Sequence, residues 1–325
     1  MASQPPGVSQ AARAPAGLRG RVTALITRVR KDPALYVMLA LPVAYFLIFH
    51  YQPMYGVIIA FKNFNFRGGI LGSPWADDFG FYHFIRFFSS NASFRLINNT
   101  FQLSFWSLLA GFPAPIILAL LLHECRLPRF KKTVQTVTYL PHFISIVAIV
   151  GILTLLLSPR DGSVNHIIAL LGLEPVYFMA DTRWFRPIYV LSGIWQSVGF
   201  GAIIYLAALS RANPELYEAA TVDGASRLQR IRYVSVPSLA SVAIILLILQ
   251  TGGILSVGFQ KVFLMQNDLN IRVSDVIATY VYRVGLLGAE RSFATAVGLF
   301  QSVVGLVLLT IVNKVSSKVS ETSLW

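Results

Sequence analysis

Long apolar runs constrain the fold of this chain more than any other feature. Each run has about 20 residues or more, which is enough to cross a bilayer as a helix. The six runs cover residues 36–61, 96–122, 133–157, 187–209, 238–257 and 292–312. A soluble domain carries about 25% charged residues, whereas this chain carries 13% and is 55% hydrophobic. The pattern predicts an all-α membrane protein with about six transmembrane helices.

The distribution of basic residues predicts the orientation in the membrane. With six spans, both ends of the chain lie on one side of the membrane. The two tails and two loops on that side hold 16 Lys and Arg, whereas the three loops on the opposite side hold 11. Basic segments stay in the cytoplasm, so both termini are expected there. The expected organisation is a basic N-terminal tail (1–31), a transmembrane domain (32–313) and a cytoplasmic tail (314–325). Basic loops of this kind account for the net charge of +13, and no nucleic-acid partner is expected.

The spans hold no Asp, Glu, Lys or Arg away from their ends. Ion-driven carriers generally need intramembrane charges or broken helices that coordinate ions, and an enzyme of the membrane interior needs a polar catalytic cluster. The chain also lacks the Gly-rich phosphate-binding loop that holds ATP. We therefore expect no catalytic residue, no metal site and no cofactor bound by this chain, and energy for transport must come from a partner.

Uncharged polar side chains in the spans are candidates for a solute path. Amides both donate and accept hydrogen bonds, and an indole offers a stacking face, which suits a hydroxyl-rich solute. The candidates are Trp195, Gln196, Gln250, Gln301 and Asn99. The alternative is that these amides join helix to helix, and the sequence leaves both open.

A polar stretch, 213–237, separates the fourth and fifth spans. Asn213 suits an N-cap, Pro214 the first helical position, and Gly224 the position just after a helix of about nine residues. Pro237 can start the fifth span. The stretch predicts an exposed helix–turn–helix that docks on another protein, and a solvated amphipathic loop is the alternative.

The spacing within this stretch resembles the EAA loop of binding-protein-dependent ABC importer permeases. Glu218-Ala219-Ala220 is followed after three residues by Gly224 and after nine more by Val234-Ser235-Val236-Pro237. Asp223 and Ala225 match the Asp-Gly-Ala form of sugar importers, whereas Val234 and Val236 replace Ile and Leu of the family pattern. Further similar segments are Pro53–Lys62, Thr279–Leu286, Phe293–Phe300 and Glu321–Trp325. They are similar to the LplB-like oligosaccharide and polysaccharide subgroup, which includes the first permease of alginate importers.

The resemblance implies a type I ABC importer permease in the bacterial inner membrane. Such a permease forms a heterodimer with a second, homologous permease, receives a saccharide from an extracytoplasmic solute-binding protein, and docks on ATPase subunits that bind ATP and Mg. The coupling residues implied are Glu218, Ala219, Ala220, Asp223, Gly224, Ala225 and Pro237. Glu218 would contact the ATPase, and Gly224 would allow the turn. Independently of the resemblance, the aromatic composition of the external loops suggests a surface for the binding protein, and the alternative is that these side chains pack the loops onto the helix ends. The residues are Trp75, Phe79, Phe81, Tyr82, Phe84, Tyr177, Phe178 and Trp184.

Three alternatives remain at this point. A permease of the same architecture could carry another solute class. A secondary carrier would work without an ATPase, and an enzyme of glycan assembly would need a catalytic cluster at a membrane face. The sequence does not give the identity, length or charge of the saccharide.

Overall fold

The computed structural model describes residues 31–255 and 257–320, and these residues are helical apart from loops and one isolated bridge between Lys62 and Trp75. The expectations for the N-terminal tail up to residue 30 and for the segment Glu321–Trp325 lie outside the described residues. The chain divides into two compact units, Met1–Ile58 and Ile59–Trp325.

The first unit contains most of the first expected span, residues 36–61. Its helices are α2 (Pro33–Phe46), the π-helical turn η1 (Leu47–Tyr51), α3 (Gln52–Met54) and the start of the 3-10 helix η2 (Tyr55–Phe61). Large apolar side chains are exposed around this helix. A helix that is apolar all round needs lipid or protein around it, so this composition agrees with a transmembrane segment.

The second unit holds the remaining elements. In order they are α4 (Gly69–Gly72), η3 (Asp78–Gly80), α5 (Tyr82–Phe88), α6 (Asn91–Gly111), α7 (Pro113–Glu124), α8 (Pro128–Tyr139), η4 (Leu140–Phe143), α9 (Ile146–Leu156), α10 (Ser163–Leu170), α11 (Thr182–Leu209), α12 (Pro214–Val222), α13 (Arg227–Arg230), η5 (Ile231–Ser235), α14 (Val236–Gly252), α15 (Phe259–Met265), α16 (Ile271–Ser274), α17 (Ile277–Val281), η6 (Tyr282–Leu287) and α18 (Arg291–Ser320).

Five helices in the described residues are long and apolar enough to cross a membrane, and a bent pair makes a sixth if it counts as one span. The bent pair is the expected third span, residues 133–157, where the chain turns by 103° between Phe143 and Ile146. Pro141 cannot donate a backbone hydrogen bond, and the helix tightens to a 3-10 turn there. Ser145 then starts a new helix, since its hydroxyl accepts a hydrogen bond from the Ala148 N–H at 3.2 Å.

Helix α11 is central to the second unit, where it packs against α6, α7, α8 and α14. One buried cluster joins α7, α11 and α14 around Ala202 and Leu239, and another joins α6 and α11 to the α15 region around Tyr189 and Val262. Gly199 permits the contact with α8, because a β-carbon there would clash with the backbone of Thr138. Helix α14 runs beside α18.

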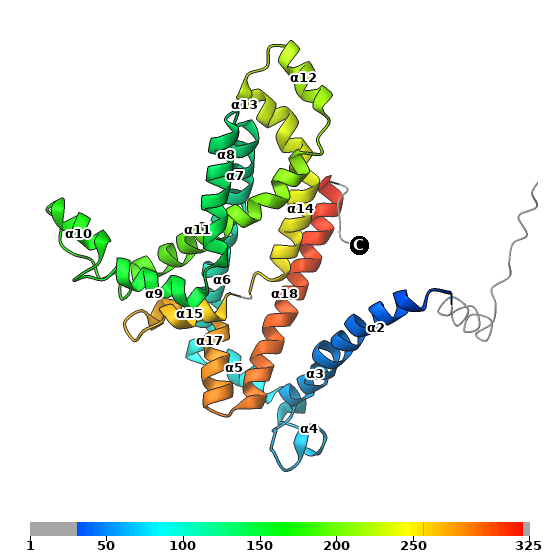
Figure 1. Cartoon of the computed structure of the whole chain (residues 1–325). Helices are drawn as coiled ribbons and strands as arrows, with labels where there is room; N and C mark the ends of the chain where they lie inside the picture. The colour runs from blue at the N-terminus through cyan, green and yellow to red at the C-terminus, as the bar shows by residue number, and fades with distance from the viewer. Residues whose placement is uncertain (1–30, 256, 321–325) are drawn as a thin grey trace, which may run out of the picture. The chain divides into compact units, whose positions relative to one another are not determined.

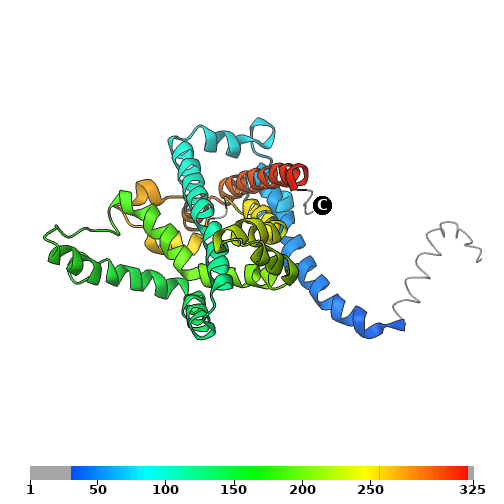
Figure 2. The same cartoon turned by 90° about the horizontal axis from the view of Figure 1, so that it is seen from above.

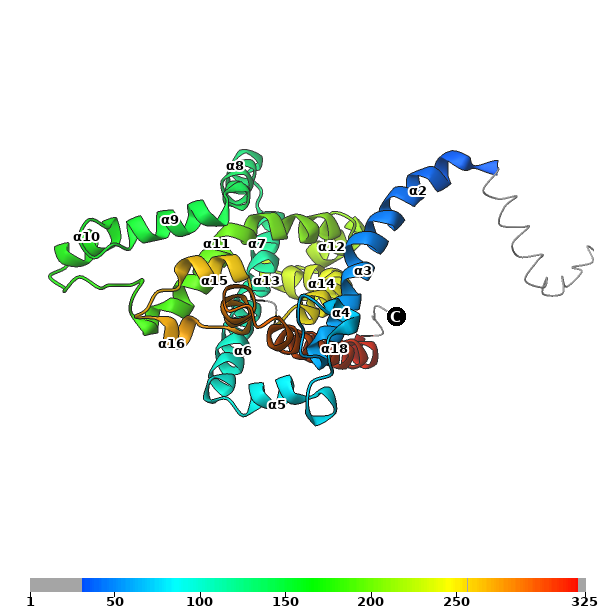
Figure 3. The same cartoon turned by 90° about the horizontal axis from the view of Figure 1, so that it is seen from below.

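The two ends of the second unit carry different elements. Figure 1 shows α12 and α13 at one end and α5 and α17 at the other. Figure 2 views the chain from the end with α12, and Figure 3 from the opposite end, where α15 lies beside α11. The polar stretch and the loop that contains α5 therefore lie at opposite ends of the second unit.

Candidate functional site

The polar stretch folds as two short helices in a hairpin, as predicted. Asn213 caps α12, because its side-chain oxygen accepts a hydrogen bond from the Glu215 N–H at 3.0 Å. Pro214 occupies the first turn, and Glu215 lies where a negative charge stabilises the helix dipole. The helix ends at Val222, which gives the nine residues expected.

Gly224 ends α12 in a left-handed conformation, with φ of 75°. The Gly224 N–H donates to the Thr221 carbonyl at 3.1 Å, and the Ala225 N–H donates to the Ala220 carbonyl at 2.9 Å. This pair of bonds is a Schellman motif. The turn therefore requires the spacing from Ala220 to Gly224. At position 224 any residue other than glycine would cost about 1 kcal/mol or more of stability, because of this φ.

The second arm begins with a capping box at Ser226. The Gln229 side chain accepts from the Ser226 N–H at 2.7 Å, and the Ser226 hydroxyl accepts from the Gln229 N–H at 3.4 Å. The chain continues through α13 into the wider turn η5, which precedes Pro237. Pro237 lies in the first turn of α14, where its missing N–H costs least.

Side-chain contacts fix the hairpin to the end of α7. Arg230 contacts Glu124 at 3.4 Å and donates to the Thr221 hydroxyl at 3.1 Å, and both charged side chains are largely buried. The Tyr217 hydroxyl lies 3.1 Å from that of Ser235, which is fully buried. The hairpin and α7 are thus joined by polar contacts, so a displacement of α12 would pull on the end of a spanning helix.

The outer face of the hairpin has no partner in the described part of the chain. Glu218, Ala219, Asp223 and Gly224 are exposed, Ala220 and Ala225 are half-buried, and Glu218 makes no ion pair among the described residues. Val222 is 88% exposed and Leu216 53% exposed. Apolar side chains beside small ones are suited to contact with another protein.

The structure separates the five candidates for a solute path. Asn99 is buried, donates to the carbonyls of Arg272 and Asp275, and accepts from Arg186. Gln301 donates to the Leu255 carbonyl at 2.6 Å. Trp195 is exposed on α11. Gln196 and Gln250 line two neighbouring cavities, and Gln196 also donates to the Ile144 carbonyl at 3.1 Å, as the helix-joining alternative predicts.

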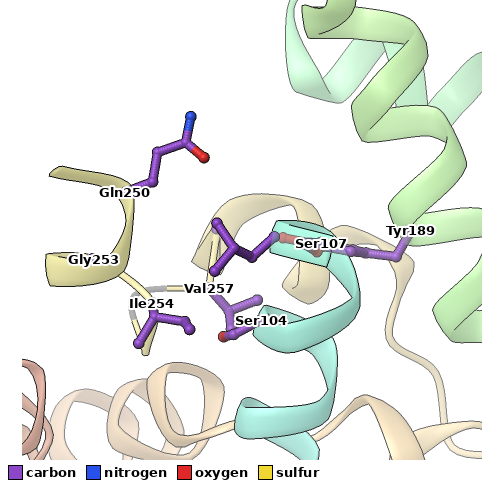
Figure 4. Close-up of a pocket in the computed structure, with 9 residues that line it drawn as sticks. Ser104, Ser107, Tyr189, Gln250, Gly253, Ile254 and Val257 are labelled. Carbon is purple, nitrogen blue, oxygen red and sulfur yellow. The ribbon is translucent and has the colours of Figure 1, made fainter. Parts of the chain in front are cut away.

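Two cavities lie between α6, α11 and the segment after α14. The first, about 250 Å³, is lined by Ser104, Ser107, Leu108, Tyr189, Gln250, Gly253, Ile254, Val257 and Gly258. In Figure 4 the two serines come from α6, Tyr189 from α11 and Gln250 from the end of α14. The second, about 270 Å³, shares Ser107, Tyr189 and Gly258 with the first and adds Gln196, Ser197 and Lys261. Hydroxyls, amides and one amine therefore converge on these cavities.

Comparison with known proteins shows which family this chain belongs to. Residues 111–321 match the family described as "Binding-protein-dependent transport system inner membrane component". The chain belongs to this family. It is a multi-pass permease of the inner membrane, and ATP hydrolysis takes place on a separate subunit.

Relatives of this permease cover nearly its whole length. "Polygalacturonan/rhamnogalacturonan transport system permease protein YteP" of Bacillus subtilis (strain 168) is 42% identical over 93% of both chains. "Protein LplB" of the same bacterium is 41% identical over 96% of this chain and 97% of its own. These relatives confirm the resemblance to the LplB-like subgroup.

Solved structures agree with this family. A chain of "a bacterial ABC transporter involved in the import of the acidic polysaccharide alginate" superposes on this permease with a TM-score of 0.84 at 43% identity, covering 91% of this chain and 99% of that one. A second structure holds the same kind of transporter "in complex with alginate pentasaccharide-bound periplasmic protein". The predicted permease architecture is confirmed.

Lys261 is a candidate functional residue of this permease that the sequence did not predict. The sequence placed it in an external loop of mixed charge, but its side chain is only 6% exposed and lines the second cavity. Burial lowers the pKa of its amine to about 8. One signal was present, because apolar Val262 and Met265 adjoin it on the same short helix.

Proposed function

We propose that this permease imports an oligosaccharide or polysaccharide, and that residues 213–237 couple its helices to an ATPase subunit. The observation that carries the coupling role is the hairpin itself. Both of its helices begin with a side-chain cap, Arg230 fixes it to α7, and its outer face is exposed. The saccharide class is supported by the substrates named for the relatives. ATP and Mg bind to the partner ATPase, and this chain contributes half of the path beside a second permease.

The roles of individual residues follow from their positions. Glu218 and Ala219 contact the ATPase surface directly, whereas Ala220, Gly224 and Ala225 hold the turn that presents them. Asp223 is exposed at the turn, and Pro237 sets the start of α14. The organisation into a basic tail (1–31), a permease domain (32–313) and a C-terminal tail (314–325) is part of this proposal.

The exposure of aromatic side chains in the external loops supports the proposal that these loops bind the solute-binding protein. Six of the eight predicted ones are exposed: Trp75, Phe79, Phe81, Tyr82, Tyr177 and Trp184. The other two are not exposed. Phe84 is half-buried beside Phe81, and Phe178 is buried and packs edge-to-face on Trp184, so both would support the surface from beneath.

The test is ATP hydrolysis by the complete complex in lipid nanodiscs. Binding protein loaded with saccharide is expected to stimulate hydrolysis, and Glu218→Ala is expected to reduce the stimulation while saccharide capture by the binding protein stays intact. A permease for another solute class would respond to no saccharide. A secondary carrier would transport in vesicles without the ATPase.

A further inference from the structure

Lys261 is a buried cation beside the proposed solute path. It lies on α15, a short helix outside the candidate spans, and its amine donates to the Tyr189 carbonyl of α11 at 2.9 Å. The same nitrogen lies 4.7 Å from the centroid of the Tyr189 ring. An ammonium has three donors, so the carbonyl bond leaves two of them available to the cavity that Lys261 lines.

No negative charge compensates this amine in the described residues. The ion pairs there are Arg86–Glu290, Arg183–Asp181, Arg230–Glu124 and Arg283–Asp275. The residues that line the cavity include hydroxyls, an amide and apolar groups, but no carboxylate. A buried cation without a counter-charge is costly, and a group retained in this state is a candidate for a functional role.

We propose that Lys261 provides the counter-charge for a carboxylate of an anionic saccharide, such as a uronic acid unit, as it passes through the permease. The surrounding groups suit the rest of such a unit. Gln196 donates one N–H to the Ile144 carbonyl and Ser197 donates its O–H to the Gly193 carbonyl. The second Gln196 N–H, the Gln196 side-chain oxygen, the Ser197 oxygen and the Ser107 hydroxyl are left for sugar hydroxyls. The adjoining cavity, with Ser104 and Gln250, continues the polar lining. This assignment rests on the proposed saccharide import and adds the charge of the substrate to it.

The test compares charge-removing and charge-retaining variants in the complete complex in proteoliposomes. Lys261→Met is expected to lower uptake of a uronate oligosaccharide at least tenfold, whereas Lys261→Arg retains most of it. The methyl-esterified form of the same oligosaccharide, which lacks the carboxylates, is expected to be transported equally by the wild type and Lys261→Met wherever the binding protein captures it. Size-exclusion chromatography checks that every variant assembles.

Lys62 offers a matched control. It is also buried, donates to the carbonyls of Ile70 and Leu71 and lies 5.2 Å from the centroid of the Trp75 ring, but it lines neither cavity. Lys62→Met is therefore expected to lower uptake of charged and esterified saccharides by the same factor.

Three results would overturn the assignment of Lys261. In the first, assembled Lys261→Met takes up the uronate within twofold of the wild type. In the second, Lys261→Arg loses as much uptake as Lys261→Met, which shows a purely structural lysine. In the third, the wild type takes up the esterified form but not the uronate. If no saccharide stimulates ATP hydrolysis by the wild-type complex, both the proposed function and the assignment of Lys261 are wrong. In the other three results the wild type still transports a saccharide, so the two kinds of failure are distinguishable.

Discussion

At the scale of single residues, Gly224 is the position most sensitive to substitution in the hairpin. With φ of 75°, a β-carbon at this position introduces strain of about 1 kcal/mol or more. Gly224→Ala is expected to reduce saccharide-stimulated ATP hydrolysis, and Gly224→Pro to abolish it, because proline cannot adopt this φ. Gly172, with φ of 77° in a loop outside the hairpin, is the matched control. If Gly172→Ala impaired coupling as much as Gly224→Ala, the effect would be general destabilisation.

The lowered pKa of Lys261 predicts a pH dependence. Burial reduces this pKa to about 8, so the amine is protonated below that pH and loses its charge above it. The titratable group facing the amine from α11 is Tyr189, and the lining of the cavity holds no carboxylate. Uptake of a uronate at low concentration is expected to fall as pH rises through about 8. Lys261→Arg, measured over the same pH series, should remove this fall, because a guanidinium stays charged.

Asn99 shows how the structure redirects a sequence prediction. Its amide bonds two carbonyls and the Arg186 side chain in a buried setting, so truncation leaves three groups unpaired. Asn99→Ala is expected to destabilise the permease by about 2 kcal/mol, measured as a lower melting temperature of the purified complex. An unchanged melting temperature with reduced uptake would instead support a solute contact.

At the scale of elements, the contact between the hairpin and α7 is open to a double-mutant cycle. Arg230 and Glu124 form a largely buried pair. Arg230→Met and Glu124→Gln are each expected to weaken saccharide-stimulated ATP hydrolysis. Expressed as a free energy, the loss in the double variant is expected to be about 1 kcal/mol smaller than the sum of the two single losses. Arg227→Met, an exposed change on the same short helix, is the control. Additive losses would show that the pair does not transmit motion.

The elements differ in how far sequence could predict them. The hairpin was predictable because its signals act over a few residues: Asn213 caps one helix, Gly224 ends it and Ser226 starts the next. The 103° turn near Ser145 was not, because Pro141 marks a weak point without giving the direction in which packing turns the chain. The burial of Lys261 depends on Tyr189, 72 positions away in the chain, and local patterns hold no information on that contact.

At the scale of the whole molecule, the expected orientation places the hairpin and the loop after α7 on the cytoplasmic side. The single cysteine, Cys125, offers a natural probe, since it directly follows Glu124, the partner of Arg230, and is partly exposed. A membrane-impermeant maleimide is expected to label Cys125 in inside-out vesicles but not in intact cells. For the opposite side, Tyr177→Cys in a Cys125→Ser background should react in intact spheroplasts, because Tyr177 is exposed in an external loop. Labelling of Cys125 from outside would invert the topology and separate the hairpin from any cytoplasmic ATPase.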